Sequence, residues 1–439
     1  MAIIVHICFV VGLGLRFWLF KTSFPGWLAS RVEISTPLTS WKRVMEGIYL
    51  TREHVSPYSG DLFHETPLML KWLDLVLKVF KQYDYLIFLA ADTLIGILLL
   101  KIANLFSKYM LLKQAADSPN YSPEASSLLL RKESLRKLEI FVVAAHMLNP
   151  YSIAVCLARS TGIFHNLLVL LAFFFTMKAQ TILSTLCLAF ATYESFYPLV
   201  LCVPAALFFH QYSVLNKKSV KEESSSLVYF LTTLGLFSFW FLMLLAVSYH
   251  LDESAQFVSS IYGFILTVPD LSPNIGIFWY FFTEMFEHFR IFFLFVFQIN
   301  ALIYTVPLAV RLREQPIFLM YILTFLTGVF KSYPSYSDVS IILALLPLWK
   351  HLFAYLRNSF IVTCMFICCT VFSPLLWHLW LYAGSANANF YFAITLVFTT
   401  AEIFLVTDLL YANLRWEYDL TYGLNRKLED GKEGQVVLE

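Results

Sequence analysis

Residues 275–308 form an apolar, aromatic-rich run that is long enough to enter a lipid bilayer. Within this run Glu284, Glu287, His288 and Arg290 lie close together. A charged side chain at membrane depth costs a few kcal/mol or more unless it faces a partner or a water-filled cavity. On one continuous helix Glu284, Glu287 and His288 share a face, since they stand at positions i, i+3 and i+4. We expect this face to contact a polar cavity or another subunit, and an internal ion pair between two helices fits the pattern equally well.

Similar apolar runs recur along the chain and indicate a membrane protein. Of its 439 residues, 59% are hydrophobic and 14% are charged, whereas a soluble domain is nearer 25% charged. Aromatic residues make up 18%, which is typical of lipid-facing helices with interfacial belts. The net charge of +1 argues against a nucleic-acid partner. We predict an all-α polytopic membrane protein with about 12 transmembrane helices, some of them short or broken, particularly between residues 160 and 210.

The chain divides into one membrane domain and a polar tail. We expect a single polytopic domain over residues 1–412 and a tail over residues 413–439. Within the domain, residues 21–84 form a long amphipathic loop. Residues 107–137 and 211–226 form two polar loops on the opposite side.

Basic residues predict which compartment each loop faces. The two polar loops and the tail are rich in Lys and Arg, whereas the short loops on the other side contain only Arg159 and Lys331. The positive-inside rule therefore places both polar loops and both termini in the cytosol, and the amphipathic loop in the lumen. Lys217 and Lys218 are candidates for contact with anionic lipid headgroups. The positive-inside bias alone also explains these two lysines.

The segment 384–389 is a candidate ligand-binding loop near the end of the chain. Its small residues let a ligand approach the backbone closely. Asn387 and Asn389 each offer an amide whose donors and acceptor suit hydroxyls and phosphate oxygens. A tight turn between helices with asparagine caps explains the same pattern.

The sequence contains no nucleotide-binding loop, HExxH, GxSxG or EF-hand pattern. A membrane-bound glycosyltransferase would need a carboxylate in the first loop on the far side, where Glu33, Asp61 and Glu65 are available. Glu33 and Ser35 form an E-x-S pattern in place of the expected D-x-D or E-x-D pattern. A solvated or capping role explains these carboxylates as well.

Four runs together resemble one protein family, the class U proteins of phosphatidylinositol-glycan anchor biosynthesis. They read SRVEISTPLTSWKRVMEGIYL at 30–50, VSPYSGDLFHETPL at 55–68, YGFILTVPDLSPNIGIFWYFFTEMFEHF at 262–289 and WHLWLYAGSANANF at 377–390. The resemblance spans nearly the whole chain in the same order. It is weakest at 107–137 and at the extreme ends. This family is also distantly similar to pathway mannosyltransferases of the glycosyltransferase C type, which implies a fold of that kind.

The resemblance implies a noncatalytic subunit of the glycosylphosphatidylinositol (GPI) transamidase in the endoplasmic reticulum membrane. That complex cleaves a C-terminal signal and joins the new carboxyl end to a GPI lipid. A separate caspase-like cysteine protease subunit performs the chemistry. The implied partners are the other subunits, the membrane and the GPI lipid, with no cofactor, metal or catalytic residue in this chain.

On this resemblance the helices form a groove for the lipid. Asn387 and Asn389 are then expected to hold its glycan or phosphate, with Ser385 as backbone or hydroxyl support. Glu284 and His288 are expected to be cavity or subunit contacts. The alternative is a dolichol-phosphate-mannose-dependent mannosyltransferase of GPI biosynthesis with Glu33 as its base, and the departure from D-x-D argues against it.

Overall fold

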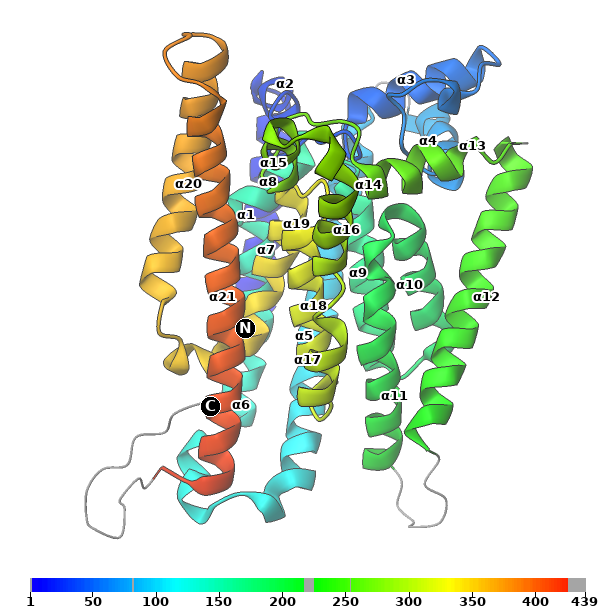
Figure 1. Ribbon diagram of the computed structural model, residues 1–439. Helices are drawn as coiled ribbons and strands as arrows, with labels where there is room; N and C mark the ends of the chain where they lie inside the picture. The colour runs from blue at the N-terminus through cyan, green and yellow to red at the C-terminus, as the bar shows by residue number, and fades with distance from the viewer. Residues whose placement is uncertain (1, 81–82, 217–224, 253, 425–439) are drawn as a thin grey trace.

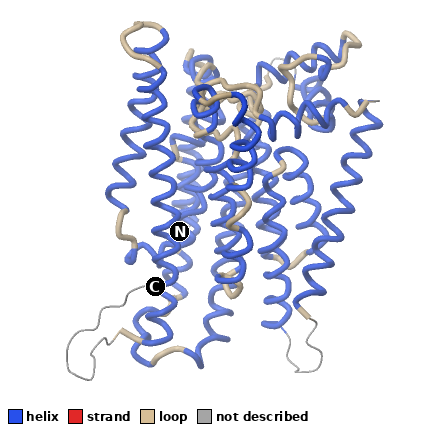
Figure 2. The backbone as a smooth tube through the Cα atoms, viewed as in Figure 1, coloured by secondary structure: helices blue, strands red, loops and turns tan. Residues whose placement is uncertain are grey.

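The computed structural model describes residues 2–80, 83–216, 225–252 and 254–424 of the chain. These residues fold into helices joined by loops, and the described part of the chain contains no strand (Figure 1, Figure 2). The predicted all-α polytopic architecture is therefore confirmed. Among the described residues, eight helices are long and apolar enough to cross a membrane, or nine if the bent pair α7 and α8 counts as one span. The number of about 12 stays a prediction.

The long apolar helices make up most of the molecule. They are α1 (Ala2–Phe20), α5 (Tyr85–Asp117), η4 with α11 (Tyr197–Leu201, Cys202–Asn216), α12 (Ser226–Asp252), η6 with α16 and α17 (Glu287–Phe289, Arg290–Asn300, Thr305–Arg311), α19 with η7 (Tyr336–Leu345, Leu346–Tyr355), α20 (Ser359–Leu381) and α21 (Ala388–Tyr422). Shorter helices pack among them, namely α7 (Leu138–Met147), α8 (Pro150–Leu157), α9 (Gly162–Met177), α10 (Thr181–Ser195) and α18 (Pro316–Phe330).

The connecting segments gather at two ends of the molecule (Figure 1). The end drawn uppermost, here called the upper end, carries the tip of the α20–α21 hairpin and the short elements α2 (Phe24–Ala29), α3 (Trp41–Arg52), η1 (Pro57–Ser59), α4 (Pro67–Phe80), α13 (Gln256–Val258), η5 (Ser259–Gly263), α14 (Phe264–Thr267) and α15 (Phe278–Glu284). The lower end carries η2 (Ser118–Asn120), η3 (Pro123–Leu128) and α6 (Lys132–Arg136). Which compartment each end faces stays a prediction.

The helices differ in how much of their surface the chain itself covers. In the most apolar stretch of α19 with η7, 61% of the residues are buried, whereas the corresponding shares are 17% in α12 and α20 and 11% in the helix that contains α16. The outer helices expose large apolar side chains such as Ile291 and Phe360. Lipid is as apolar as these side chains, so a bilayer lets them stay outside the protein core.

The short helices predicted between residues 160 and 210 are confirmed, and unusual backbone geometry bounds them. Arg159, Ala179 and Phe196 all have positive φ angles, of 55°, 54° and 62°. Such left-handed geometry is unfavourable for a residue with a side chain and does not continue a helix. It falls before α9, between α9 and α10, and directly after α10. These turns keep both helices shorter than the ~20 residues of an upright span.

A buried ionic cluster joins α1, α5 and α7. Nε of Arg16 lies 2.6 Å from Oδ2 of Asp92, and Nε2 of His146 lies 3.2 Å from Oδ1 of the same carboxylate. The Arg16 side chain is 0% exposed and the Asp92 side chain 1% exposed. Arg16 also donates to the Met147 carbonyl at 2.6 Å. The positive charge of Arg16 on α1 and the negative charge of Asp92 on α5 therefore neutralise each other inside the membrane domain.

The last helix differs from the expected boundary at residue 412. α21 continues to Tyr422, and its final turns include Arg415 and Asp419, whose side chains lie 3.3 Å apart. Both side chains are buried. This i,i+4 ion pair stabilises the part of α21 that follows its apolar run. A hydropathy pattern does not reveal this extension, because the residues involved are charged. The remainder of the expected tail, from residue 425, lies outside the described residues, as do Lys217 and Lys218.

We expect Arg16→Met to lower the stability of the protein by about 3 kcal/mol, because it leaves Asp92 buried without its main cationic partner. Thermal unfolding of the purified protein in detergent measures this loss. The double variant Arg16→Met, Asp92→Leu should recover part of it. Lys108→Met, at an exposed position of α5, is the matched control. Equal unfolding temperatures for Arg16→Met and Lys108→Met would show that the buried pair is not stabilising.

Candidate functional site

The loop between α20 and α21 is a tight turn that uses several of its own polar groups. Gly384 has φ +63°, a left-handed conformation that glycine adopts without steric cost. The backbone N–H of Ser385 donates to the Leu379 carbonyl at 3.0 Å. Oδ1 of Asn387 accepts the backbone N–H of Asn389 at 3.1 Å and so caps α21. The capping turn considered above as one explanation of this pattern is therefore present.

Asn389 contacts the aromatic helix α15. The Tyr280 hydroxyl donates to Oδ1 of Asn389, and the Tyr280 ring stacks on Phe392 with 4.4 Å between the ring centroids. The side-chain oxygens of Asn387 and Asn389 are thus occupied within the chain. Both residues are exposed, so their side-chain N–H groups remain accessible to a ligand. Such donors suit phosphate and hydroxyl oxygens.

An aromatic cluster beneath this turn joins α15, α20 and α21. The ring centroid of Trp279 lies 5.7 Å from that of Phe392 and 6.4 Å from that of Trp380. Trp377 lies 5.2 Å from Tyr391 in the same cluster. Aromatic pairs of this kind contribute about 0.5–1.5 kcal/mol each beyond the burial of their area. The cluster therefore holds the hairpin, with its two asparagines, against the rest of the upper end.

Glu33 lies next to this cluster in a closed pair with Arg31. Nη2 of Arg31 lies 2.6 Å from Oε1 of Glu33, and Nε lies 3.0 Å from Oε2. The Tyr391 hydroxyl donates to Oε1 at 2.8 Å. The two charged side chains are only 8% and 3% exposed. Both oxygens of Glu33 are therefore engaged in a bidentate, charge-assisted contact, which is a poor arrangement for a base that must take a proton from a substrate.

The same pair ties the start of the chain to distant helices. The Glu33 carbonyl accepts the backbone N–H of Tyr336 at 2.8 Å. The Arg31 guanidinium lies over the rings of Trp27 and Trp377, at 5.7 and 5.6 Å from their centroids. Cation–π contacts of this kind stabilise a charge that is removed from water. Residues 31–33 are thus fixed against α19, α20 and α21.

Glu65, a second candidate carboxylate, has different surroundings. Its Oε1 accepts the hydroxyl of Thr161 at 2.5 Å. Burial raises the pKa of Glu65 to about 7, and the hydrogen bond from Thr161 offsets only part of that rise. Burial lowers the pKa of the neighbouring His64 to about 4, and its ring stacks on Phe264. Asp61, the third candidate, is exposed.

The expectation that Glu284, Glu287 and His288 share one helical face is wrong. α15 ends at Glu284, because Met285 is extended with φ −81° and ψ 155°. The chain then reverses, so that Phe281 packs on Phe297 with 4.8 Å between the ring centroids. This aromatic packing outweighs continuation of the helix. Glu284 and His288 are both exposed at the upper end. Glu284 lies beside Tyr280, and the ring of His288 packs against Phe289 with 3.9 Å between the ring centroids.

Arg290 joins the reversed segment to α14. Its Nη2 donates to the Val268 carbonyl at 2.8 Å and to the Thr267 carbonyl at 3.4 Å. Val268 has a left-handed φ of 49°, which ends α14 and exposes carbonyls that the helix does not use. Arg290 therefore ties this segment to α14 through backbone carbonyls and not through the internal ion pair considered in the sequence analysis.

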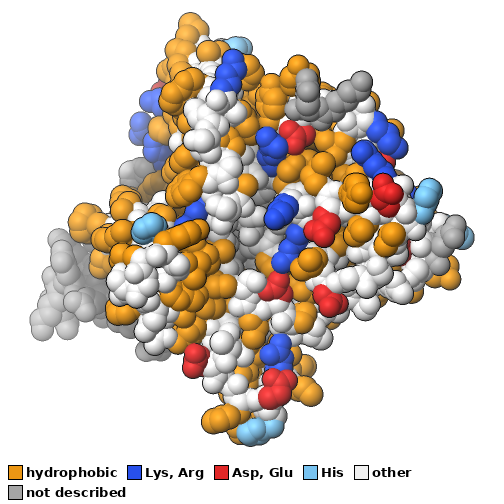
Figure 3. Space-filling model, turned by 90° about the horizontal axis from the view of Figure 1, so that it is seen from above, with side chains coloured by type: hydrophobic (Ala, Val, Ile, Leu, Met, Phe, Trp, Pro, Cys, Tyr) orange, Lys and Arg blue, Asp and Glu red, His pale blue; other side chains and the backbone are white. Residues whose placement is uncertain are grey.

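Several charged side chains at the upper end form ion pairs. Seen from above, Lys and Arg side chains lie beside Asp and Glu side chains across this face (Figure 3). The ion pairs that carry this pattern are Arg52 with Asp74 at 2.7 Å, Arg159 with Asp84 at 2.8 Å and Arg43 with Asp270 at 3.1 Å. These cations already have carboxylate partners.

Sequence reasoning missed three residues that build this site, namely Arg31, Tyr280 and Tyr391. Arg31 and Glu33 carry opposite charges two positions apart, and this was the one local signal available. Tyr280 and Tyr391 stand in aromatic runs where nothing distinguishes them from lipid-facing neighbours. Their roles follow from contacts between segments far apart in the chain.

The fold and the site define an all-α polytopic membrane protein. At its upper end, the turn that contains Asn387 and Asn389 is exposed, and the carboxylate of Glu33 is buried beside it in a pair with Arg31. The chain belongs to the family described as "GPI transamidase subunit PIG-U", whose sequence profile matches residues 10–398. It is 43% identical over 434 residues to "GPI-anchor transamidase component PIGU" of Homo sapiens, with 98% of each chain covered. It is 29% identical over 394 residues to "GPI transamidase component GAB1" of Saccharomyces cerevisiae, with 89% of each covered. The family resemblance predicted from the sequence is confirmed.

We expect Glu65 to make stability depend on pH. In the folded protein its carboxyl keeps its proton up to about pH 7, whereas the ordinary pKa is 4.5. The folded state binds more protons than the unfolded state between these values, so the free energy of unfolding falls as the pH rises through this range. The lowered pKa of His64 has the opposite effect on stability below about pH 6.5, so the test compares variants. The unfolding temperature of the wild type relative to that of Glu65→Gln should decrease from pH 5 to pH 7.5. Glu53→Gln, at an exposed position, should keep the wild-type slope; an unchanged slope in Glu65→Gln would contradict the assignment.

Proposed function

We propose that this protein is a noncatalytic subunit of the GPI transamidase that binds and positions the GPI lipid. The observation that carries the proposal is the exposed turn at the upper end, where Asn387 and Asn389 present amide donors above an aromatic cluster. The printed names of the relatives, which call them components of this transamidase, support the subunit role.

The proposed task is positioning. A GPI lipid already lies in the bilayer, so its acyl chains need only apolar helix faces, and few polar contacts suffice for recognition. The donors of Asn387 and Asn389 would hold phosphate or glycan oxygens, with the exposed Ser385 as a supporting hydroxyl. Holding the lipid amine near an acyl-enzyme on a separate caspase-like subunit raises its effective concentration there. Glu284 and His288, exposed at the same end, are proposed contacts for another subunit.

The proposal includes an orientation in the endoplasmic reticulum membrane. The upper end would face the lumen, and both termini would lie in the cytosol. The basic loop at residues 107–137, which the structure places at the lower end, supports this orientation through the positive-inside rule.

The alternative function, a dolichol-phosphate-mannose-dependent mannosyltransferase, needs a free carboxylate in the first upper loop. The closed pair of Glu33 with Arg31 and Tyr391 speaks against Glu33 as that base. Glu65 is the carboxylate whose raised pKa would suit a base. A test of the noncatalytic assignment therefore has to include both residues.

The lipid-positioning proposal predicts the effect of Asn387→Asp with Asn389→Asp. Aspartate keeps the acceptor oxygen that caps α21 and the acceptor for Tyr280, but it removes the donors and adds repulsion toward phosphate. In cells that lack this protein, the double variant should assemble with the other subunits and leave mature GPI unattached. The surface level of a GPI-anchored reporter should fall by about tenfold or more, since each hydrogen bond to a charged group contributes about 1.5–3 kcal/mol.

Asn216→Ala, at an exposed position of the lower end, is the control and should rescue like wild type. Asn387→Ala with Asn389→Ala provides a second variant without added charge. Normal reporter levels in both double variants would overturn the proposed site, and failure of both to assemble would show that the turn serves assembly only.

The noncatalytic assignment predicts that Glu33→Gln and Glu65→Gln leave the synthesis of mature GPI intact. Mass spectrometry of GPI intermediates in the rescued cells measures this. Accumulation of a glycan that lacks one mannose in either variant would establish the mannosyltransferase instead.

A further inference from the structure

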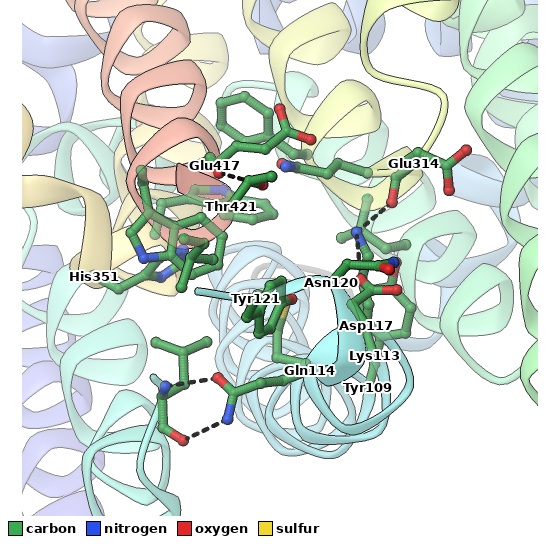
Figure 4. Close-up of a pocket in the computed structure, with 18 residues that line it drawn as sticks. Tyr109, Lys113, Gln114, Asp117, Asn120, Tyr121, Glu314, His351, Glu417 and Thr421 are labelled. Atoms are coloured by element: carbon green, nitrogen blue, oxygen red, sulfur yellow. Dashed lines mark hydrogen bonds and ion pairs between the residues drawn. The ribbon is translucent and has the colours of Figure 1, made fainter. Parts of the chain in front are cut away.

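A separate polar cavity opens at the lower end, at the opposite end of α21 from the asparagine turn. It has a volume of about 270 Å³, somewhat below the 300–1,000 Å³ of pockets for drug-sized ligands. Side chains from the last turns of α5 and α21 face each other across it, and His351 of η7 lies beside them (Figure 4). The space therefore suits a small polar group better than a whole lipid or a folded peptide.

The lengths of two helices fit a position of this cavity at the membrane surface. At about 1.5 Å per residue, the 33 residues of α5 and the 35 residues of α21 span about 50 Å and 52 Å. The hydrocarbon core of a bilayer is only about 30 Å thick. The lining residues of α5 and α21 lie in their last turns. The extra length of both helices allows these turns to reach the depth of the lipid headgroups.

Hydrogen bonds fix the walls of the cavity. Gln114 accepts the backbone N–H of Leu130 at 2.7 Å and donates to the carbonyl of Leu130 at 3.3 Å. These two bonds hold the connection between η3 and α6 against α5. Lys113 donates to the Glu314 carbonyl at 2.6 Å. These contacts are drawn in Figure 4. They use backbone partners, so the shape of the site does not depend on a ligand.

The charges and rings of the lining match a zwitterion. Lys113 stands on the α5 wall, 3.7 Å from Asp117, while Glu417 stands on the facing α21 wall. Altogether one lysine and three carboxylates line the cavity, together with the aromatic residues Tyr121 and Trp416. An ammonium group is stabilised by carboxylates and by aromatic faces, and a phosphate by a lysine. Arg311 lies 3.4 Å from Glu417 and Arg313 lies 3.4 Å from Glu314, so each lining carboxylate has a cation nearby. The charges of the site balance, and a headgroup without net charge matches them best.

We infer that this cavity binds the headgroup of a zwitterionic, amine-bearing phospholipid from the adjacent leaflet. Lys113 faces its phosphate, and the carboxylates of Asp117 and Glu417 with the neighbouring rings receive its ammonium. This site is independent of the GPI site proposed at the upper end, because different residues at the opposite end of α21 form it.

Photolabelling of the assembled complex tests the inference. The complex, purified from cells and placed in nanodiscs, is illuminated with phosphatidylethanolamine whose acyl chain carries a diazirine near the glycerol. Matched phosphatidylserine and phosphatidylcholine probes are used in parallel, and labelled peptides are mapped by mass spectrometry. Phosphatidylethanolamine should label the last turns of α5 or α21 about fivefold more than phosphatidylserine does. Phosphatidylcholine labelling as strong as that of phosphatidylethanolamine also supports a zwitterion site, with a quaternary ammonium accepted.

Charge-neutral variants sharpen the test. Asp117→Asn with Glu417→Gln keeps the shape of the lining and should lower phosphatidylethanolamine labelling to the phosphatidylserine level. Glu133→Gln, an exposed glutamate of α6 at the same end, should leave it unchanged. The upper-end variant Asn387→Asp with Asn389→Asp should also leave it unchanged, whatever its effect on GPI attachment.

Two results would overturn the inference. One is labelling of the cavity that is equal for all three headgroups or unaffected by the double variant. The other is carbodiimide crosslinking of Asp117 or Glu417 to a lysine of another subunit, which would show a protein segment in the cavity.

Discussion

The carboxylate of Glu33 determines how the upper end is built. A buried carboxylate must be paired, and here Arg31 and Tyr391 occupy both of its oxygens. The pair holds residues 31–33 against Tyr391 of α21 and, through the backbone of Tyr336, against α19. It also removes from solvent the group that a transferase would use as a base. The same interaction therefore fixes the upper end of the fold and leaves Glu33 without a free oxygen to act as a base.

Charge is handled differently at different depths of the molecule. Inside the membrane domain, Arg16 and Asp92 are held within 2.6 Å of each other and are shielded from lipid. On the upper face, cations and carboxylates pair side by side while staying partly exposed. At the asparagine turn, exposed groups that can donate to an anion are neutral amides. In the proposed lipid site, these neutral donors would favour selection by geometry over selection by charge.

Local signals in the sequence predicted the apolar helices, the short segments near residues 160–210 and the cap formed by Asn387. These features depend on composition and on neighbours a few residues away. The contact between Tyr280 and Asn389 could not be predicted, because it joins segments 109 residues apart. The break at Met285 follows from aromatic packing of α15 against α16, which no helical periodicity encodes. The extension of α21 past residue 412 depends on burial of an ion pair by other parts of the chain.

α21 is a single uninterrupted helix whose N-cap belongs to the asparagine turn and whose last turn lines the lower cavity. A helix of about 52 Å behaves nearly as a stiff rod. A tilt of about 2° around its midpoint displaces each tip by about 1 Å in opposite directions. A rigid-body tilt of α21 would therefore move Asn387 and Thr421 together and in opposite directions, although no side chain connects these two residues.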